Sequence, residues 1–315
     1  MPPRYLRVSL TARCNLRCFY CRPQGDCAEC DGTEEPTPDQ LGLLVRCAAA
    51  EGVRKVRLTG GEPLERADLE AIARIVSATA GINETTLTTN GIGLDRRAEA
   101  LMRAGLGRAN VSLDTLRPDR FARITGHDRL GEVLAGIDAA VRAFEEVKLN
   151  TVLLRGINDD EIEPLVRFAA ERGICIRFIE RYGSPGSPPA SGDAVSAEEV
   201  KRRLRRAFGP LERLPSPPLS VEESYALPQA GGARVGIIAA ASHPPCCTCA
   251  KLRFTAEGRL QACLFAPAEG DDLRPLLRRG DEQAIRSAIR DCFAAKRAKP
   301  ASRRSLPEPV NRIGG

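Results

Sequence analysis

Aromatic and imidazole side chains are scarce in this sequence. Its 315 residues include no Trp, four Tyr, nine Phe and two histidines, His127 and His243. So few aromatic rings leave little surface on which bases could stack, which argues against a nucleic-acid partner. Two histidines argue against zinc sites of the two-cysteine, two-histidine kind and against a hydrolytic triad built on histidine.

Long apolar runs are missing as well. None approaches the roughly 18 residues that a membrane span requires, and the opening segment MPPRYLRVSL has neither the apolar region nor the cleavage site of a signal peptide. The net charge is +6, and its densest block, Lys201–Arg206, is typical of a solvated helix face, with nucleic-acid binding as the alternative. We therefore expect a cytoplasmic protein with no membrane and no nucleic acid as partner.

Strand-like and helix-like segments alternate over the first part of the chain. We predict strands at Tyr5–Leu10, Val53–Leu58, Thr85–Thr89, Arg108–Leu113, Val147–Leu154 and Ile174–Ile179. The segment TPDQ, with Thr37 as N-cap, Pro38 at the first helical position and Gln40 closing a capping box, predicts a helix near Pro38–Ala50. Apolar spacing of three and four predicts helices at Ala67–Ala80, Leu130–Phe144 and Asp159–Glu171. Six strand-then-helix units imply parallel strands joined by right-handed crossovers, either in an open doubly wound sheet or in an incomplete TIM-like barrel. In both, ligands gather at the carboxyl ends of the strands.

A Gly-, Pro- and Ser-rich stretch, Gly183–Gly192, interrupts this alternation and reads as a loop or linker. We therefore divide the chain into a core (1–182), a linker with a connecting helix (183–233) and a small C-terminal region (234–315). Within the last part we predict a strand at Arg234–Ala239, a hairpin turning at Glu257-Gly258 and a helix near Asp281–Lys296.

Twelve cysteines are the most informative feature that is present, because in a reducing compartment they indicate metal or redox chemistry. Cys14, Cys18 and Cys21 form a C-x3-C-x2-C run. A 4Fe-4S cluster held by three thiolates keeps one iron open to a molecule from outside the protein. The alternative for this run is a zinc knuckle.

A second triplet, C-x2-C-x13-C, has the same number of ligands. It consists of Cys246, Cys249 and Cys263, and the adjacent Cys247 leaves a four-thiolate zinc site as the alternative. Cys27 and Cys30 could exchange into a cluster, bind a metal, form a redox pair or be ordinary loop thiols. Cys47, Cys175 and Cys292 lie among apolar residues, and we expect them in the core.

The first triplet, with Tyr20 before its last cysteine, resembles the CxxxCxxC motif of the radical SAM superfamily. Two further segments agree with that resemblance, TGGEP (Thr59–Pro63) and VSLD (Val111–Asp114). The resemblance implies that S-adenosylmethionine completes the cluster as its fourth ligand. The residues that it assigns to S-adenosylmethionine are Tyr20, Gly60, Gly61, Glu62, Asn90 and Ser112.

Nearly end to end, the chain resembles the GTP 3′,8-cyclase family of molybdenum cofactor biosynthesis. The matching segments are LRVSLTARCN, RLTGGEPLERADL, TTNG, RANVSLDTL, ITGHD, VKLNTVLLRGIND, IRFIE, GRLQACLF and the terminal RIGG. The resemblance implies an α/β fold, a partial (βα)6 TIM-like barrel with a small C-terminal cluster-binding region. It also implies a lyase that converts GTP to 3′,8-cyclo-7,8-dihydro-GTP through a 5′-deoxyadenosyl radical, using two 4Fe-4S clusters and S-adenosylmethionine.

Substrate contacts and partners follow from the same resemblance. The residues that it assigns to GTP are Arg7, Arg57, Lys148, Arg177, Lys251 and Arg253. It implies a flavodoxin- or ferredoxin-type reductant and admits a homodimer. Gly314 and Gly315 correspond to a tail that reaches the active site, with a frayed terminus as the alternative.

The chain departs from the family pattern at three positions. Ala12 stands where the family has Asp, and Ala250 and Lys251 stand where it has Asn and Arg. Lysine keeps the charge but loses the planar fork of arginine. Because the last two changes touch the substrate side, a related two-cluster radical SAM enzyme for another nucleotide or a peptide stays open as an alternative. The non-enzyme alternative is a cysteine-rich zinc-binding module for nucleic acid.

Overall fold

The computed structural model describes residues 4–21, 34–181, 194–215, 222–239, 242, 249–263 and 270–298. Several predictions concern residues outside these ranges and are not tested by the fold. They are the loop Gly183–Gly192, the cysteines Cys27, Cys30, Cys246 and Cys247, and the tail residues Gly314 and Gly315.

Six parallel strands form the central part of the sheet in chain order. They are β1 (Arg4–Ser9), β2 (Val53–Thr59), β3 (Glu84–Thr89), β4 (Arg108–Ser112), β5 (Glu146–Leu153) and β6 (Cys175–Glu180). Every bound lies within one residue of its prediction, and the α/β fold with a parallel, barrel-like sheet is confirmed. Each strand pairs with the next one along the chain, as right-handed strand–helix–strand units require.

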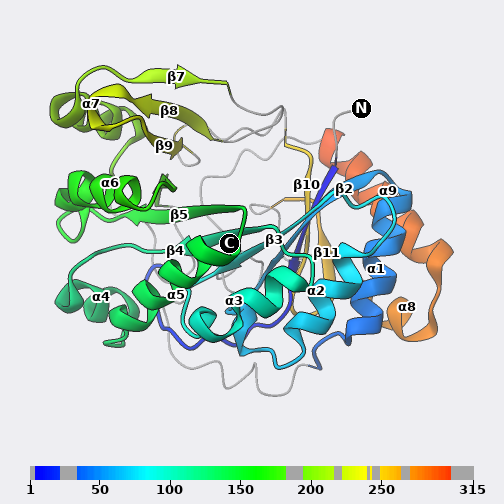
Figure 1. Ribbon diagram of the computed structural model, residues 1–315. Coiled ribbons are helices and arrows are strands. Elements are labelled where there is room, and N and C mark those ends of the chain that lie inside the picture. Colours follow the sequence, from blue (N-terminus) through cyan, green and yellow to red (C-terminus); the bar gives the residue numbers. More distant parts are fainter. Residues whose placement is uncertain are drawn as a thin grey trace.

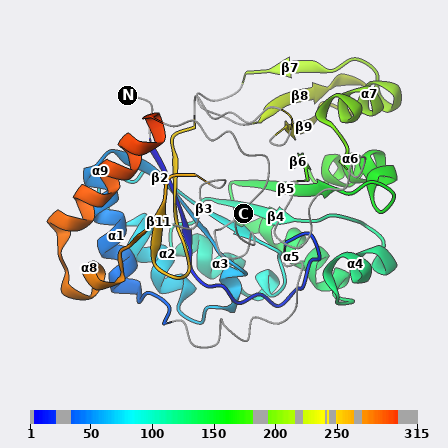
Figure 2. The same ribbon diagram turned by 180° about the vertical axis from the view of Figure 1, so that it is seen from behind.

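Helices follow the curved sheet on its outer side (Figures 1 and 2). They are α1 (Pro38–Ala50), α2 (Leu69–Ser77), α3 (Leu94–Arg103), α4 (Pro118–Thr125), α5 (Leu130–Ala143) and α6 (Ile162–Glu171), with short 3-10 helices η2 (Pro63–Glu65) and η3 (Asp159–Glu161). Helix α1 begins as predicted, because Thr37 accepts from the Gln40 backbone and the Gln40 side chain accepts from Thr37 in a capping box. Helices α3 and α4 were not predicted.

The chain beyond β6 extends the sheet at both of its edges. On the β6 side it adds β9 (Ala233–Ile238), β8 (Glu223–Leu227) and β7 (Glu212–Leu214), and on the β1 side it adds β10 (Lys251–Phe254), β11 (Arg259–Gln261) and β12 (Asp271–Asp272). The remaining elements are α7 (Ala197–Phe208), η4 (Pro228–Ala230), α8 (Arg274–Arg279) and α9 (Glu282–Ala298). The predicted C-terminal strand, hairpin and helix are confirmed as β9, β10–β11 and α9. Figure 2 shows β9 and β11 on opposite sides of the six central strands.

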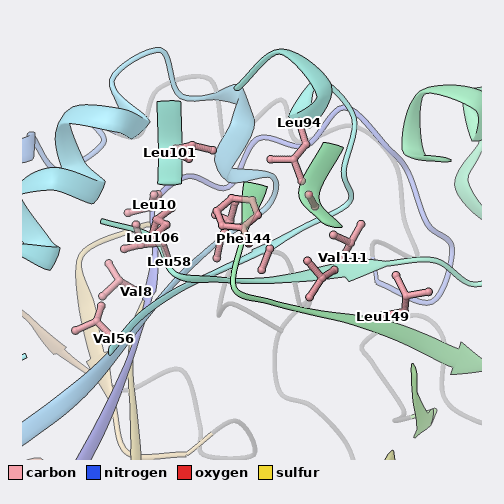
Figure 3. Close-up of a cluster of buried hydrophobic side chains, with 14 of the residues drawn as sticks. Val8, Leu10, Val56, Leu58, Leu94, Leu101, Leu106, Val111, Phe144 and Leu149 are labelled. Atoms are coloured by element: carbon pink, nitrogen blue, oxygen red, sulfur yellow. The ribbon is translucent and has the colours of Figure 1, made fainter. Parts of the chain in front are cut away.

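The helix-facing side of the sheet carries the hydrophobic core (Figure 3). Val8, Val56, Leu58, Val111 and Leu149 project from β1, β2, β4 and β5 toward the helices, and none is more than 1% exposed. Burial of such a side chain contributes roughly 1.5–3 kcal/mol. Because side chains alternate along a strand, the residues between them line the opposite, interior face. No helix in the described ranges combines the length and apolarity needed to cross a membrane.

Candidate cofactor and substrate site

The interior face of the sheet carries a row of arginines on three neighbouring strands. Arg7 on β1 stands in register with Arg57 on β2 and with Arg253 on β10. Arg7 and Arg253 are buried, and Arg57 is half-buried with its Nε donating to Thr86 Oγ1 at 3.2 Å. Arginine suits bidentate contacts with phosphate oxygens, so this row can bind a polyanion.

Lys251 lies beside the same row. Burial, followed by the positive charge of Arg7, lowers the pKa of the Lys251 ammonium to about 7, with Arg57 and Arg253 adding to the effect. The pKa of Arg177 on β6 is lowered first by burial and then by Arg57, although Glu222 lies 3.6 Å from it. Cations crowded in this way favour an anionic ligand, because its charge would relieve their mutual repulsion.

Uncompensated polar atoms also point to a polar ligand in the interior. Among the described residues, no hydrogen-bond partner exists for Tyr5 OH, Ser9 Oγ, Thr88 Oγ1 or Asn150 Oδ1, all of which are buried. Buried polar groups are ordinarily hydrogen-bonded, so a ligand with several donors and acceptors fits this face.

Lys148, which is also assigned to GTP, forms an ion pair with Glu146 at 3.3 Å. Ser112 ends β4 in register with Asn150.

The three-cysteine loop leaves the carboxyl end of β1 and packs directly on the TGGEP segment. Gly61 N donates to Thr11 O at 2.7 Å, and Glu62 N donates to Arg13 O at 2.8 Å. A Cβ atom at Gly61 would lie 2.1 Å from Arg13 O. Glycine is therefore required here because two backbones approach closely, and the close neighbour is the cysteine loop itself.

The ITGHD segment supports the other side of this loop. Arg17 N donates to Thr125 O at 2.8 Å, and Phe19 N donates to Ile124 O at 3.1 Å. Both acceptors belong to the last turn of α4, whose carbonyls have no partner within the helix. The cysteine loop thus binds the end of a helix that the sequence analysis did not predict.

The VSLD segment holds the loop through Tyr20. The Tyr20 hydroxyl donates to Asp114 Oδ2 at 2.6 Å, while Val152 N donates to Asp114 Oδ1 at 2.8 Å. Asn158, which is fully buried, donates from Nδ2 to the Asp114 carbonyl at 2.8 Å. Burial raises the pKa of the Asp114 carboxyl to about 6, even though the hydrogen bonds from Tyr20 and Val152 act to lower it.

Hydrogen bonds of Glu62 and Asn90 also connect the barrel to the three-cysteine loop. Thr89 Oγ1 and Leu64 N donate to Glu62 Oε1 at 2.6 and 3.0 Å, and Asn90 N donates to Glu62 Oε2 at 2.6 Å. Burial raises the pKa of the Glu62 carboxyl to about 7 against the effect of these three bonds. Asn90 Nδ2 donates to Asn15 Oδ1 at 2.7 Å and lies 4.0 Å from Cys14 Sγ. The contacts predicted between Glu62, Asn90 and S-adenosylmethionine stay predictions.

The three thiols of the loop are close enough to influence one another. The pKa of Cys18 is raised well above its usual range, first by burial and then by Cys21, Asp114 and Cys14. Within the described ranges, however, no three Cys, His, Asp or Glu side chains are grouped closely enough to bind a single metal ion. A cluster attaches each thiolate to a different iron, so this all-thiol donor set fits an iron–sulfur cluster better than one zinc ion.

The second cysteine triplet is described in part. Cys249 lies two residues before β10 and Cys263 lies two residues after β11, and the two strands are antiparallel with Arg253 opposite Gln261. Both thiols therefore lie at the same end of this hairpin. Burial acts to raise the pKa of Cys249, but the nearby Lys296 ammonium, the Lys251 backbone and the Lys251 ammonium together outweigh burial, and the pKa is lowered overall. Two thiols at the open end of a hairpin fit the expected cluster.

Sequence reasoning missed several residues that hold these loops. Arg66 is buried and donates to Leu10 O at 3.1 Å and to Pro36 O at 3.0 Å, and it pairs with Asp68. Glu180, at the end of β6, accepts from Ala197 N at 2.7 Å and from Ser242 N at 2.8 Å. The segments LER and IRFIE contain these residues, but a charged residue in a motif gives no sign of which backbone it will bind.

Two sequence families match this chain. The Radical SAM superfamily matches residues 8–169, and Molybdenum Cofactor Synthesis C matches residues 174–301. Together they span both the barrel strands and the strands added at the two edges. The three-cysteine loop on a partial parallel barrel thus defines a radical SAM protein, whose cofactors are a 4Fe-4S cluster and S-adenosylmethionine.

Curated relatives show to which family of radical SAM proteins the chain belongs. The GTP 3′,8-cyclase of Pelotomaculum thermopropionicum is 41% identical over 295 residues, covering 93% of this chain and 90% of the relative. That of Moorella thermoacetica is 40% identical over 317 residues, covering 99% and 97%. GTP 3′,8-cyclase 2 of Mycobacterium tuberculosis is 43% identical over 328 residues, covering 98% and 89%. The chain belongs to the GTP 3′,8-cyclase family.

Solved structures agree on the fold. Streptococcus suis SuiB bound to S-adenosylmethionine superposes with a TM-score of 0.63 at 15% identity, covering 91% of this chain and 68% of that one. Native anSMEcpe with bound AdoMet gives 0.51 at 16% identity, covering 65% of this chain and 59% of that one. At 15% and 16% identity, these two similarities support the fold of this chain and nothing about its function.

Proposed function

We propose that this protein is a GTP 3′,8-cyclase, a radical SAM lyase that converts GTP to 3′,8-cyclo-7,8-dihydro-GTP in the first step of molybdenum cofactor biosynthesis. The names of relatives that cover nearly the whole chain support this substrate and reaction. One observation in this chain carries the proposal. The arginine row joins the two cysteine triplets, because Arg7 lies on the strand that leads to Cys14 and Arg253 lies on the strand that follows Cys249.

Each part of the interior has a role in this proposal. Arg7, Arg57, Arg253 and Lys251 bind the triphosphate, and Arg177 and Lys148 bind neighbouring groups of GTP. A substrate fixed by its phosphates presents one hydrogen to the cofactor, and such orientation is what the protein contributes to reactions of this kind. The buried side-chain atoms of Tyr5, Thr88 and Asn150, which have no hydrogen-bond partner in the described part of the chain, supply further hydrogen bonds.

Cofactor binding is divided between the two triplets. Cys14, Cys18 and Cys21 hold the first cluster, and Cys246, Cys249 and Cys263 hold the second. When bound, the first cluster supplies the electron that cleaves S-adenosylmethionine and so generates the 5′-deoxyadenosyl radical that abstracts hydrogen from GTP. Tyr20, Gly60, Gly61, Glu62, Asn90 and Ser112 are the proposed surroundings of S-adenosylmethionine. Through Asp114, Tyr20 also fixes the loop that carries the first triplet.

The proposal includes partners and chain organisation. The electron donor is a flavodoxin- or ferredoxin-type protein, and the reaction takes place in the cytoplasm. The core (1–182) serves S-adenosylmethionine, and 234–315 serves the second cluster. Sedimentation of the reconstituted protein would decide whether the chain forms a homodimer.

The experiment is an anaerobic assay of the iron- and sulfide-reconstituted protein with S-adenosylmethionine, dithionite and GTP. Mass spectrometry would follow 5′-deoxyadenosine and the nucleotide. We expect 5′-deoxyadenosine to form only with GTP and a dihydro-cyclised nucleotide to accumulate. Cleavage of S-adenosylmethionine with GTP unchanged would contradict the substrate, and Ala250→Asn and Lys251→Arg variants would then locate the difference.

A further inference from the structure

The end of α9 reaches the hairpin that carries two predicted ligands of the second cluster. Lys296 donates from Nζ to the carbonyl oxygen of Lys251 at 2.6 Å and to the carbonyl oxygen of Ala262. Lys251 lies two residues after Cys249, and Ala262 directly precedes Cys263. A single ammonium therefore bridges the backbone of the two segments that present these thiols.

The same ammonium places a positive charge at the end of the hairpin that carries the two thiols. Within the described residues Lys296 forms no ion pair with a carboxylate, and its two carbonyl acceptors are neutral. This half-buried charge is thus held between the two segments that carry the predicted iron ligands.

We propose that Lys296 is a positioning residue of the second cluster, which sets the spacing of Cys249 and Cys263 and shifts the cluster toward its reduced state. This inference rests on the proposed function, because it assumes that the second triplet binds a 4Fe-4S cluster. Reduction adds one negative charge to the cluster, and a nearby cation stabilises the more negative state. Hydrogen bonds and charge near the thiolates are among the factors that set the potential of such clusters.

The test isolates the second cluster. A full-length variant with Cys14, Cys18 and Cys21 replaced by Ala removes the first triplet, so any reconstituted 4Fe-4S signal comes from the second. Its midpoint potential is measured by redox titration monitored by electron paramagnetic resonance. The variants are Lys296→Gln, which keeps hydrogen-bond donors but loses the charge, and Lys296→Arg, which keeps both. Lys201→Met, which removes another lysine paired with Glu198 and Glu223, is the matched control.

We expect Lys296→Gln to lower the equilibrium constant for one-electron reduction about tenfold, a shift of about 59 mV to more negative potential. Lys296→Arg and Lys201→Met should keep the original potential. Loss of iron from Lys296→Gln with retention in Lys296→Arg would also support the role, since Lys296→Arg keeps the charge that Lys296→Gln removes. Equal potentials in the Gln and Arg variants, or loss of iron from both, would overturn it.

Failure of the proposed function gives a different result. If the variant lacking the first triplet binds no iron with Lys296 intact, the second cluster is absent, and both the two-cluster assignment and this inference are overturned. If that variant binds a cluster whose midpoint potential is the same with Lys296 and with Lys296→Gln, the two-cluster assignment stands and only the inference is overturned.

Discussion

The hydroxyl of Tyr20 donates a hydrogen bond of 2.6 Å to the buried carboxylate of Asp114, across 94 residues of sequence. This bond fastens the three-cysteine loop to the carboxyl ends of β4 and β5, because Asp114 also accepts from Val152 N. Tyr20 lies between two predicted ligands, Cys18 and Cys21, so this bond links the ligand-bearing segment directly to the barrel.

Tyr20→Phe should weaken the attachment of the cysteine loop to the barrel without loss of the iron–sulfur cluster. The ring stays, but Asp114 loses a buried hydrogen bond, and an unsatisfied buried acceptor costs about 1–3 kcal/mol. We expect reconstituted iron to remain near the normal amount while the rate of 5′-deoxyadenosine formation falls by tenfold or more. Iron analysis and the rate of S-adenosylmethionine cleavage check this.

A matched control exists in Tyr225→Phe. The Tyr225 hydroxyl donates to Glu223 Oε2 at 2.9 Å, far along the sheet on β8. That variant should lose a comparable hydrogen bond and keep its cleavage rate. Equal rates in both variants would show that the Tyr20–Asp114 bond contributes only to stability.

Gly61→Ala should disrupt the cluster loop. Its new Cβ would lie 2.1 Å from Arg13 O and 2.7 Å from Ala12 O, both backbone atoms that cannot turn away as a side chain would. We expect the reconstituted protein to hold markedly less iron and the melting temperature of the iron-free protein to fall. Gly131→Ala is the control, since nothing lies within 4 Å of a Cβ at that position on α5, and alanine in a helix is favoured by about 0.5–1 kcal/mol. Normal iron content in Gly61→Ala would show that the close approach is dispensable.

Glu62 should make the stability of the iron-free protein depend on pH. Burial raises the pKa of its carboxyl from 4.5 to about 7, so the folded state binds more protons than the unfolded state between those values. The free energy of unfolding should therefore fall as pH rises from about 4.5 to about 7, by on the order of 3 kcal/mol from this residue. Asp114, whose pKa is raised by burial to about 6, adds a fall in the same direction.

Glu62→Gln separates the two carboxyls. The variant should lose the Glu62 part of the pH dependence and retain the Asp114 part, which urea unfolding at several pH values would measure. It should also be less stable at pH 5, because one amide NH2 faces donors such as Asn90 N that need an acceptor. A pH profile identical to that of the unchanged protein would contradict the assignment.

Local patterns predicted the local structure well. The capping box from Thr37 to Gln40 starts α1 where expected, and the period-two alternation of Leu6 and Val8 against Arg7 identifies β1 together with its two faces. Both signals lie within a few residues, where backbone geometry and burial determine the outcome. The short α4 was missed because its eight residues give the periodicity too little length.

Contacts between segments far apart in the chain could not be predicted from the sequence. Nothing near Lys251 indicates that β10 pairs with β1, some 240 residues earlier in the chain, because pairing partners are selected by the whole fold. Glu62 was assigned to S-adenosylmethionine, but the hydrogen bonds that its two oxygens accept from Thr89, Leu64 and Asn90 were not predicted. The residue type predicts a buried acceptor but not which donor reaches it.

The arginine row should control substrate binding independently of S-adenosylmethionine. Arg253→Met removes the guanidinium that stands beside Arg7 while keeping a long apolar stem. A lost charge-assisted contact costs about 1.5–3 kcal/mol, so the apparent KM for GTP should rise roughly 10- to 100-fold. The binding of S-adenosylmethionine, measured by calorimetry without GTP, should be unchanged, because the residues proposed for it lie at the ends of other strands and in the cysteine loop. Arg205→Met, an exposed arginine on α7, should alter neither quantity. An unchanged KM in Arg253→Met would exclude this arginine from the triphosphate contacts, whereas equal losses of both ligands would mean that the variant disturbs β10 and not the substrate alone.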